Sequence, residues 1–353
     1  MKKVSLIVSI FLILGFDVAK LAPTATYPGE ISTVTGLPNN IEKSFLVASY
    51  QGINENKIAR SSYDHDTLFD YSGWDLAKLF PNRNRELAYQ YYGHIPGVIW
   101  IEKSFFIDET EITNIHWAEF LFYSKIENSE PVIDGVLPND YYTNPKYRFF
   151  PVVGITHEQA VAFCEWRTEI VTEKFNKEKG YKNTDKDYTI FKFRLPTQDE
   201  WEKCAGYGLD TDKYPHGFKT LKRPIKFTKK AAEYLHGNTI NSISKDDLSL
   251  EIDSFNKNQK EDYVINCKRP VDTFLNLKTP FNVWAYPKNQ FGIYNMLGNV
   301  AEMTFNKGEA KGGSWLDQLE YCKISSIKTY NNRNYDVGFR TVCVLEWPNK
   351  SGR

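Results

Sequence analysis

Two short β-like runs are each followed at once by a helix-start motif, and this pattern constrains the fold more than any other feature. The runs and their motifs are Val152–Ile155 with Thr156 and Gln159, and Phe191–Leu195 with Thr197 and Glu200. In a capping box, the threonine side chain and the Gln or Glu side chain three residues later bond each other's backbone N–H groups. We therefore expect a short strand and then a helix at both places, the first helix running to about Lys174.

Other segments extend the same mixed pattern. Val98–Ile107 (VIWIEKSFFI) is β-branched and aromatic and predicts a strand. Thr113 is a suitable N-cap for a helix that runs to about Ile126. Residues 218–265 are rich in Lys, Asn and Asp with weak periodicity, which predicts a long surface insertion. Short strands, few long helices and long loops together predict an α+β fold rich in loops.

The start of the chain carries an export signal. Lys2 and Lys3 precede a run of thirteen mostly apolar residues, Val4–Phe16, which is typical of a secretory signal peptide and short for a membrane span. We assign residues 1–22 to the signal peptide, with an uncleaved anchor as the alternative. Residues 23–94 form a polar, aromatic-rich N-terminal extension, and residues 95–347 form the main domain.

Charge and histidine spacing exclude several function classes. Lys plus Arg and Asp plus Glu number 44 each, so the net charge is zero, and the whole-chain balance gives no electrostatic case for nucleic acid. The six histidines share no metal-ligand spacing such as His-x-x-x-His. The chain also has no Gly-x-Ser-x-Gly, phosphate-binding loop or Cys-x-x-Cys motif.

A resemblance to a known family rests on segments in a fixed order. They are Phe106–Asn114 (FIDETEITN), Pro151–Ile155 with the helix carrying Cys164–Arg167, Phe193–Glu202, Asn295–Glu302 (NMLGNVAE), Gly312–Trp315 (GGSW) and Gly338–Arg340 (GFR). This order resembles the sulfatase-modifying-factor family, the formylglycine-generating-enzyme domain, over about residues 95–345. The resemblance implies a C-type-lectin-like fold.

A narrower resemblance concerns Asp140–Thr168 (DYYTNPKYRFFPVVGITHEQAVAFCEWRT) and the segment Asp108–Trp117. Both are similar to the gliding-motility lipoproteins J and K of Bacteroidetes, which belong to the type IX secretion and gliding machinery. The resemblance implies export to the periplasm or outer membrane of a Gram-negative bacterium, with envelope or secretion-machinery proteins as partners. No cysteine precedes Cys164, so a lipidated N-terminal cysteine is not expected.

The family's oxidase chemistry needs two cysteines after the Gly-Gly-Ser motif, which bind copper(I) through soft thiolates. Counted forward from Gly312, their positions hold Asp317 and Cys322; counted backward from Gly338, Cys322 matches a structural disulfide cysteine instead. Either count leaves the catalytic pair incomplete. We therefore expect neither copper nor formylglycine generation; if the chain were active, Cys322 and Ser314 would carry the reaction.

The resemblance also implies two disulfides and a calcium site. Cys164 and Cys343 resemble one structural pair of the family, and Cys204 and Cys322 resemble the other under the backward count, which leaves Cys267 unpaired; buried free cysteines are the alternative. The residues that match a structural calcium site of the family are Asn295, Gly298, Val300 and Glu302. They offer hard oxygen ligands. The alternative is a Gly-Asn turn with Glu302 in a buried ion pair.

These observations rank the functions. The first is a non-catalytic envelope scaffold or binding protein that uses the fold as an interaction platform, linked to protein secretion or gliding. The second is a formylglycine-generating oxidoreductase that acts on a cysteine of a target protein. Glycan binding through calcium ranks last, because the calcium ligand set leaves little room for a sugar.

Overall fold

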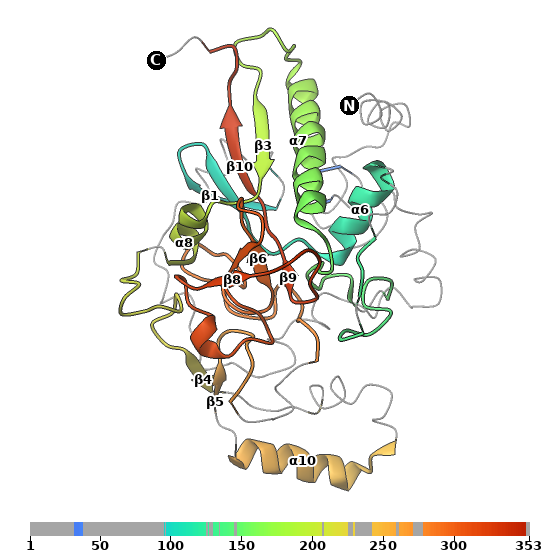
Figure 1. Cartoon of the computed structure of the whole chain (residues 1–353), viewed down its shortest axis with the longest axis vertical. Coiled ribbons are helices and arrows are strands. Elements are labelled where there is room, and N and C mark those ends of the chain that lie inside the picture. The colour runs from blue at the N-terminus through green and yellow to red at the C-terminus, as the bar shows by residue number, and fades with distance from the viewer. Residues whose placement is uncertain are drawn as a thin grey trace.

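The fold mixes helices with short strands and long loops, as Figure 1 shows for the computed structural model of the chain. The structure describes residues 32–37, 95, 97–124, 126, 130–133, 135–144, 147–206, 208–224, 229, 242–258, 261–270 and 278–350. The signal peptide and most of the N-terminal extension lie outside these residues. Within them, no helix is long and apolar enough to cross a bilayer. The α+β expectation is confirmed at this coarse level.

The first sheet is antiparallel, with strand order β1-β2-β10-β3. Its strands are β1 (Val98–Glu102), β2 (Phe105–Asp108), β10 (Val342–Glu346) and β3 (Ile190–Arg194). The C-terminal strand β10 is inserted between β2 and β3, so the two ends of the domain are joined in one sheet. Figure 1 shows the long helix α7 (His157–Lys179) running beside β3 and β10.

Helix α7 begins at the predicted capping box. Thr156 accepts a bond from the Gln159 backbone N–H, and the Gln159 side chain accepts one from the Thr156 N–H. Several side chains of the helix pack into the main core; they include Ala160, Phe163, Cys164 and Val171. The helix passes the predicted end at Lys174 and stops at Gly180, whose left-handed φ of 72° terminates it.

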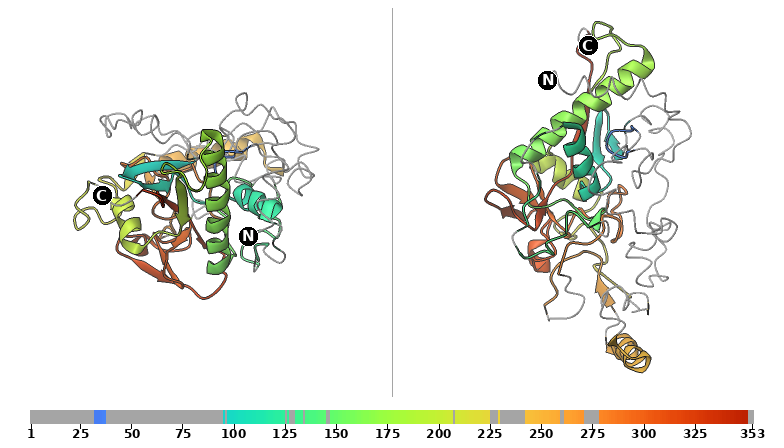
Figure 2. Two further views of the ribbon diagram at one scale, coloured as in Figure 1. Left: turned by 90° about the horizontal axis from the view of Figure 1, so that it is seen from above. Right: turned by 90° about the vertical axis from the view of Figure 1, so that its right-hand side faces the viewer.

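Two further helices pack near this sheet. α6 (Asn114–Ser124) follows Thr113, whose hydroxyl accepts a bond from the His116 N–H. α8 (Gln198–Gly206) opens at the second predicted capping box, in which Thr197 and Glu200 bond each other's backbone. Both helix starts are therefore confirmed. The two views in Figure 2 show α6 and α7 lying next to each other on one side of the molecule.

The second sheet, with strand order β8-β7-β6-β9, carries the most specific motifs. Its strands are β6 (Ala301–Met303), β7 (Glu309–Lys311), β8 (Ile327–Thr329) and β9 (Val337–Gly338). β6 pairs in parallel with β9, and the other pairs are antiparallel. A 3-10 helix, η6 (Leu319–Tyr321), lies in the loop between β7 and β8.

Two strand predictions were wrong. Val98–Ile107 is a hairpin rather than one strand, because Lys103 adopts a positive φ of 44° and turns the chain between β1 and β2. Val152–Ile155 is buried but forms no strand; next to it, an isolated bridge links Thr113 and Pro151. Gly154 turns the chain there with a φ of 74°, and its N–H and C=O bond Asn334 and Val132 in neighbouring loops.

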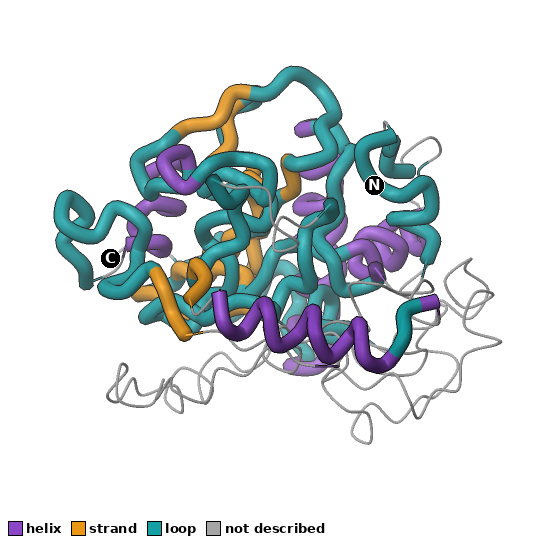
Figure 3. Tube along the Cα trace, turned by 90° about the horizontal axis from the view of Figure 1, so that it is seen from below, coloured by secondary structure: helices purple, strands orange, loops and turns teal. Residues whose placement is uncertain are grey.

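The predicted insertion is only partly a surface feature. It contains β4 (Lys222–Pro224), β5 (Glu261–Tyr263) and α10 (Lys245–Asn258), with residues 225–228, 230–241 and 259–260 outside the described residues. In Figure 3, viewed from below, α10 lies nearest the viewer. Val264 and Ile265, at the end of the insertion, are buried in the core around α8. The surface assignment is therefore wrong for its last residues.

A short segment of the N-terminal extension is built into the domain. Val34 is buried in the main core, and its carbonyl accepts a bond from Arg167 on α7 at 2.9 Å. Ser32 and Thr35 donate their hydroxyl protons to Glu119 of α6 at 2.6 and 2.8 Å. Residues 32–37 therefore belong to the packed structure, although the predicted boundary at residue 95 leaves them out.

Candidate functional site

The Gly-Gly-Ser-Trp loop follows β7 and folds back against Cys322. Gly312 and Gly313 have positive φ values of 89° and 68°, which glycine adopts without strain. A Cβ on Gly313 would lie 2.7 Å from the Cys322 Sγ, so only glycine fits here. The loop thus brings together Ser314 and Cys322, the two residues that the sequence singled out for any residual catalysis.

Ser314 sits in a charged network rather than beside a second thiol. Its Oγ lies 2.7 Å from an Asp317 oxygen and 2.8 Å from an Asp336 oxygen. Lys328, on β8, places its Nζ 2.6 Å from the same Asp317 oxygen, in hydrogen-bond contact with Asp336, and 3.3 Å from the Ser314 Oγ. One ammonium group therefore bridges two carboxylates beside the Gly-Gly-Ser motif and offsets one of their two negative charges.

The protonation of Lys328 follows from these contacts. Partial burial alone lowers the pKa of its ammonium group, but the charge of Asp336 and the hydrogen bonds with both aspartates outweigh burial and raise the pKa. Lys328 is therefore held as a cation and is unsuited to act as a base toward Ser314. Asp317, which the forward count aligns with the first catalytic cysteine, is committed to a salt bridge.

Cys322 has a different neighbour from the one expected. Its thiol shares a hydrogen bond with Cys267, and this bond and burial raise the pKa of Cys322. The same bond lowers the pKa of Cys267 against the effect of burial. The family resemblance pairs Cys322 with Cys204 and leaves Cys267 unpaired. In the structure Cys267 is the thiol in contact with Cys322, and Cys204 shares the apolar cluster around α8 with both.

All five cysteines are free, buried thiols in the structure. Cys164 of α7 and Cys343 of β10 lie in the same core cluster, and burial raises the pKa of both. Their pairing stays a prediction. Burial also raises the pKa of Cys204, to about 12, so this thiol is not an activated nucleophile.

The predicted calcium ligands lie around a buried ion pair. Arg340 bonds both carboxylate oxygens of Glu302 at 2.6 Å, and the Trp201 Nε1 bonds one of them at 2.7 Å. All of these side chains are fully buried. The carboxylate that would supply most of the charge for calcium is thus already neutralised. This geometry favours the alternative reading of the motif, a turn with Glu302 in a buried ion pair, over calcium at these residues.

A second buried carboxylate shares this environment. Burial and the charge of Glu302 raise the pKa of Glu111 to about 8, while Arg340 acts in the opposite direction. Asn295 and Asn299 donate amide protons to Glu111 at 3.2 and 2.8 Å. The Asn295 Oδ1 is buried without a hydrogen-bond partner. Of the predicted calcium ligands, Asn295 therefore offers a free hard oxygen, whereas Glu302 does not.

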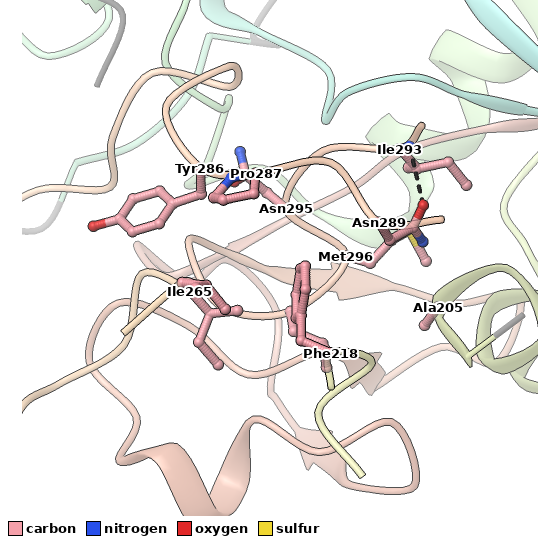
Figure 4. Close-up of a pocket in the computed structure, with 11 residues that line it drawn as sticks. Ala205, Phe218, Ile265, Tyr286, Pro287, Asn289, Ile293, Asn295 and Met296 are labelled. Atoms are coloured by element: carbon pink, nitrogen blue, oxygen red, sulfur yellow. Dashed lines mark hydrogen bonds between the residues drawn. The ribbon is translucent and has the colours of Figure 1, made fainter. Parts of the chain in front are cut away.

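A small cavity lies beside Asn295, as Figure 4 shows. Most of its lining is apolar, and Phe218, Ile265 and Met296 are examples. Tyr286 and Pro287 form the wall next to Asn295 in this view. Neither Ser314 nor Cys322 lines it. Of the predicted calcium residues, Asn295 lines this cavity.

Comparison with protein families decides the identity of the domain. The sequence model of the sulfatase-modifying factor enzyme 1-like domain matches residues 96–345, most of the chain and nearly the predicted range. The chain belongs to this family. The family resemblance expected from the ordered segments is therefore confirmed.

Two curated relatives are similar to part of this sulfatase-modifying-factor chain. Both are inactive Cα-formylglycine-generating enzyme 2, from Bos taurus with 25% identity over 179 residues and from Mus musculus with 24% over 178 residues. Each match covers 48% of this chain, and 40% or 39% of the relative. The chain thus matches well under half the length of these relatives.

Solved structures also align with the domain. One is PvdO from Pseudomonas aeruginosa, with a TM-score of 0.41 and 13% identity over 68% of this chain and 80% of that chain. Another is Treponema denticola variable protein 1, with a TM-score of 0.37 and 18% identity over 70% of this chain and 91% of that chain.

Within this sulfatase-modifying-factor domain, sequence reasoning found Ser314, Cys322 and Glu302 but not their partners. Lys328 and Asp336 lie 14 and 22 positions after Ser314, and no short motif marks them. Glu111 and Arg340 both stand in segments that carried the family resemblance. Their charged side chains could have marked Glu111 and Arg340 as candidates, but only the fold brings them close to Glu302.

Proposed function

We propose that this chain is a non-catalytic binding or scaffold protein of the bacterial cell envelope, built on a formylglycine-generating-enzyme-like domain. The observation that carries the proposal is the network at Ser314. Where the oxidase chemistry needs a second thiolate for copper(I), this chain has Asp317 bound to Lys328. A carboxylate neutralised by an ammonium group is a poor ligand for a soft metal.

The relatives support the same direction. Both curated relatives are named inactive enzymes, so a non-catalytic role has a precedent among proteins similar to this chain. The remaining thiol, Cys322, is fully buried and has a raised pKa, which disfavours the thiolate that copper(I) binds. These residues do not fit a copper site, and we assign no step to copper.

The proposed location and partners follow from the sequence. The basic and apolar start of the chain favours export, and the similarity of Asp140–Thr168 to gliding-motility lipoproteins favours envelope or secretion-machinery proteins as partners. Exposed aromatic and apolar side chains near the Gly-Gly-Ser loop offer a contact surface to such a partner. Tyr321 and Ile327 are 60% and 49% exposed there, and aromatic side chains are enriched in protein interfaces.

Affinity purification tests this proposal. The chain, tagged at its C-terminus, is isolated from native envelopes, and co-purifying proteins are identified by mass spectrometry against a tagged unrelated exported protein. We expect enrichment of secretion or gliding components, and reduced enrichment for the surface variant Tyr321→Ser with Ile327→Ser. Recovery of the same proteins with both baits, or of soluble periplasmic enzymes alone, would contradict the scaffold role.

A further inference from the structure

The contact between Cys267 and Cys322 is unlike that of any other cysteine in the described part of the chain. The two thiols share a hydrogen bond, although they stand about 55 positions apart. Their exposed fractions are 1% and 0%. Both lie in the apolar cluster around α8. Two sulfurs in hydrogen-bond contact need only a small movement to reach disulfide geometry.

The backbone holds the two cysteines in this position. Lys268, the residue after Cys267, pairs with Gln318 in a parallel bridge, and its N–H donates to the Asp317 carbonyl at 2.9 Å. Gln318 is the N-cap of η6, and the turn closes when the Cys322 N–H bonds the Leu319 carbonyl at 3.0 Å.

The glycine loop presses on Cys322 from the other side. The position of a Cβ on Gly313 is only 2.7 Å from the Cys322 Sγ, and the same sulfur lies 4.0 Å from the Ser314 carbonyl. The sulfur is thus confined between this loop and Cys267. In the folded chain this confinement keeps the Cys322 sulfur beside Cys267, so the native fold favours the pairing of these two cysteines over other pairings.

We propose that Cys267 and Cys322 form a disulfide bond when the chain folds in the presence of a disulfide oxidant. The thiolate of one cysteine attacks the oxidant's disulfide and releases one thiol. The second cysteine then attacks the mixed disulfide and releases the other thiol. The two cysteines lose two electrons and two protons in all, and the oxidant gains them as two thiols.

Both sulfurs are buried in the folded chain, so an oxidant reaches them only while the chain folds. The exchange therefore takes place before the Gly-Gly-Ser loop closes over Cys322, and either cysteine can attack the oxidant first.

The bond would change the cysteine assignments and close the candidate site. With Cys267 bound to Cys322, Cys204 becomes the thiol without a partner, in place of Cys267. The disulfide also removes the last thiol beside Ser314. This inference does not rest on the proposed scaffold role, because a disulfide can form whatever protein the chain binds.

Peptide mapping tests the inference. The full chain is unfolded and reduced, refolded in a buffer of oxidised and reduced glutathione, alkylated, and digested with trypsin without reduction. Cleavage sites at Lys and Arg place each cysteine in a separate peptide. Glu261–Lys268 then carries Cys267, and Gly312–Lys323 carries Cys322. We expect these two peptides to be linked, and the peptide with Cys204 to be alkylated.

Two cysteine variants test the Cys267–Cys322 bond independently of the wild-type peptide map. Cys204→Ser should keep the linked peptides, and Cys267→Ser should lose them. In the wild type, oxidation should raise the midpoint of thermal unfolding by about 10 °C relative to the reduced protein, because the cross-link closes a long loop. Cys204→Ser should keep the part of this rise that comes from the Cys267–Cys322 bond, and Cys267→Ser should lose that part. A link from Cys204 to Cys322, or full alkylation of Cys267 and Cys322 in refolded protein, would overturn the proposal.

Discussion

At the scale of single residues, Lys328 decides how the Gly-Gly-Ser loop is stabilised. Its ammonium group is in contact with both Asp317 and Asp336, and Asp336 is almost completely buried. Removing one partner of such a cluster leaves a carboxylate with neither water nor a cation nearby. The network therefore holds the Gly-Gly-Ser loop against β8 and the segment before β9.

Lys328→Met should destabilise the folded chain, because it keeps the apolar stem but removes the charge. We expect a loss of about 2–4 kcal/mol in the free energy of unfolding, measured by urea denaturation. Lys307→Met is the matched control, since Lys307 pairs with Glu158 on the surface and such pairs contribute about 0–1 kcal/mol. Equal effects of the two substitutions would show that the network adds nothing beyond a surface ion pair.

Glu302 gives a second prediction at this scale. Because Arg340 and Trp201 occupy its carboxylate, calcium has to displace a buried ion pair in order to bind. We therefore expect a strong calcium chelator to leave the midpoint of thermal unfolding unchanged, measured before and after dialysis against the chelator. A fall of several degrees that is reversed by added calcium and absent in Asn295→Ala would restore the calcium site predicted from the family resemblance.

At the scale of secondary-structure elements, the docking of residues 32–37 on α6 should depend on pH. Burial raises the pKa of Glu119 to about 7 against the effect of its bonds to Ser32 and Thr35. Folding therefore favours the protonated carboxyl. Its contribution to stability is fully present below about pH 4.5 and is lost as the pH rises through 7.

Glu119→Gln should remove this dependence. We expect the difference in unfolding free energy between wild type and variant to change by roughly 3 kcal/mol between pH 4.5 and 7.5, in favour of the wild type at the acid end. His116 titrates in the opposite sense, because burial lowers its pKa to about 3, but it is common to both proteins and cancels in the difference. Glu169→Gln, on the exposed face of α7, is the control. A flat difference curve for Glu119→Gln would refute the buried carboxyl.

Local chemistry explains which elements could be predicted from the sequence. The capping boxes at Thr156 and Thr197 act within four residues, so both helix starts were correct. The β1–β2 turn has no glycine or Asn-Gly pair, and its positive φ falls on Lys103. The residues of the turn therefore give no turn signal, and the sequence predicts one continuous strand. Val152–Ile155 has strand composition, but tertiary contacts at Gly154 prevent ladder pairing.

At the scale of the whole molecule, the family and the main motifs were predictable, but the partners of each site residue were not. Ser314 and Cys322 could be singled out because they follow a fixed motif. Lys328 lies on β8, Asp336 immediately precedes β9, and Cys267 follows the predicted insertion by two residues. Only the closed fold joins these segments to Ser314 and Cys322. The composition of 218–265 predicts a surface loop, whereas Val264 and Ile265 at its end are buried in the same cluster as Cys267.

Because Asp317 and Lys328 stand where the oxidase chemistry needs a thiolate, we expect this sulfatase-modifying-factor domain not to generate formylglycine. The most direct measurement incubates the reduced, full chain with copper(I), air and a Cys-x-Pro-x-Arg peptide, and follows the peptide mass over time beside an active enzyme of the family. We expect no conversion by this chain under conditions where the active enzyme converts the peptide completely. Conversion of the cysteine to formylglycine that persists in the wild type and disappears in Cys322→Ser would contradict it.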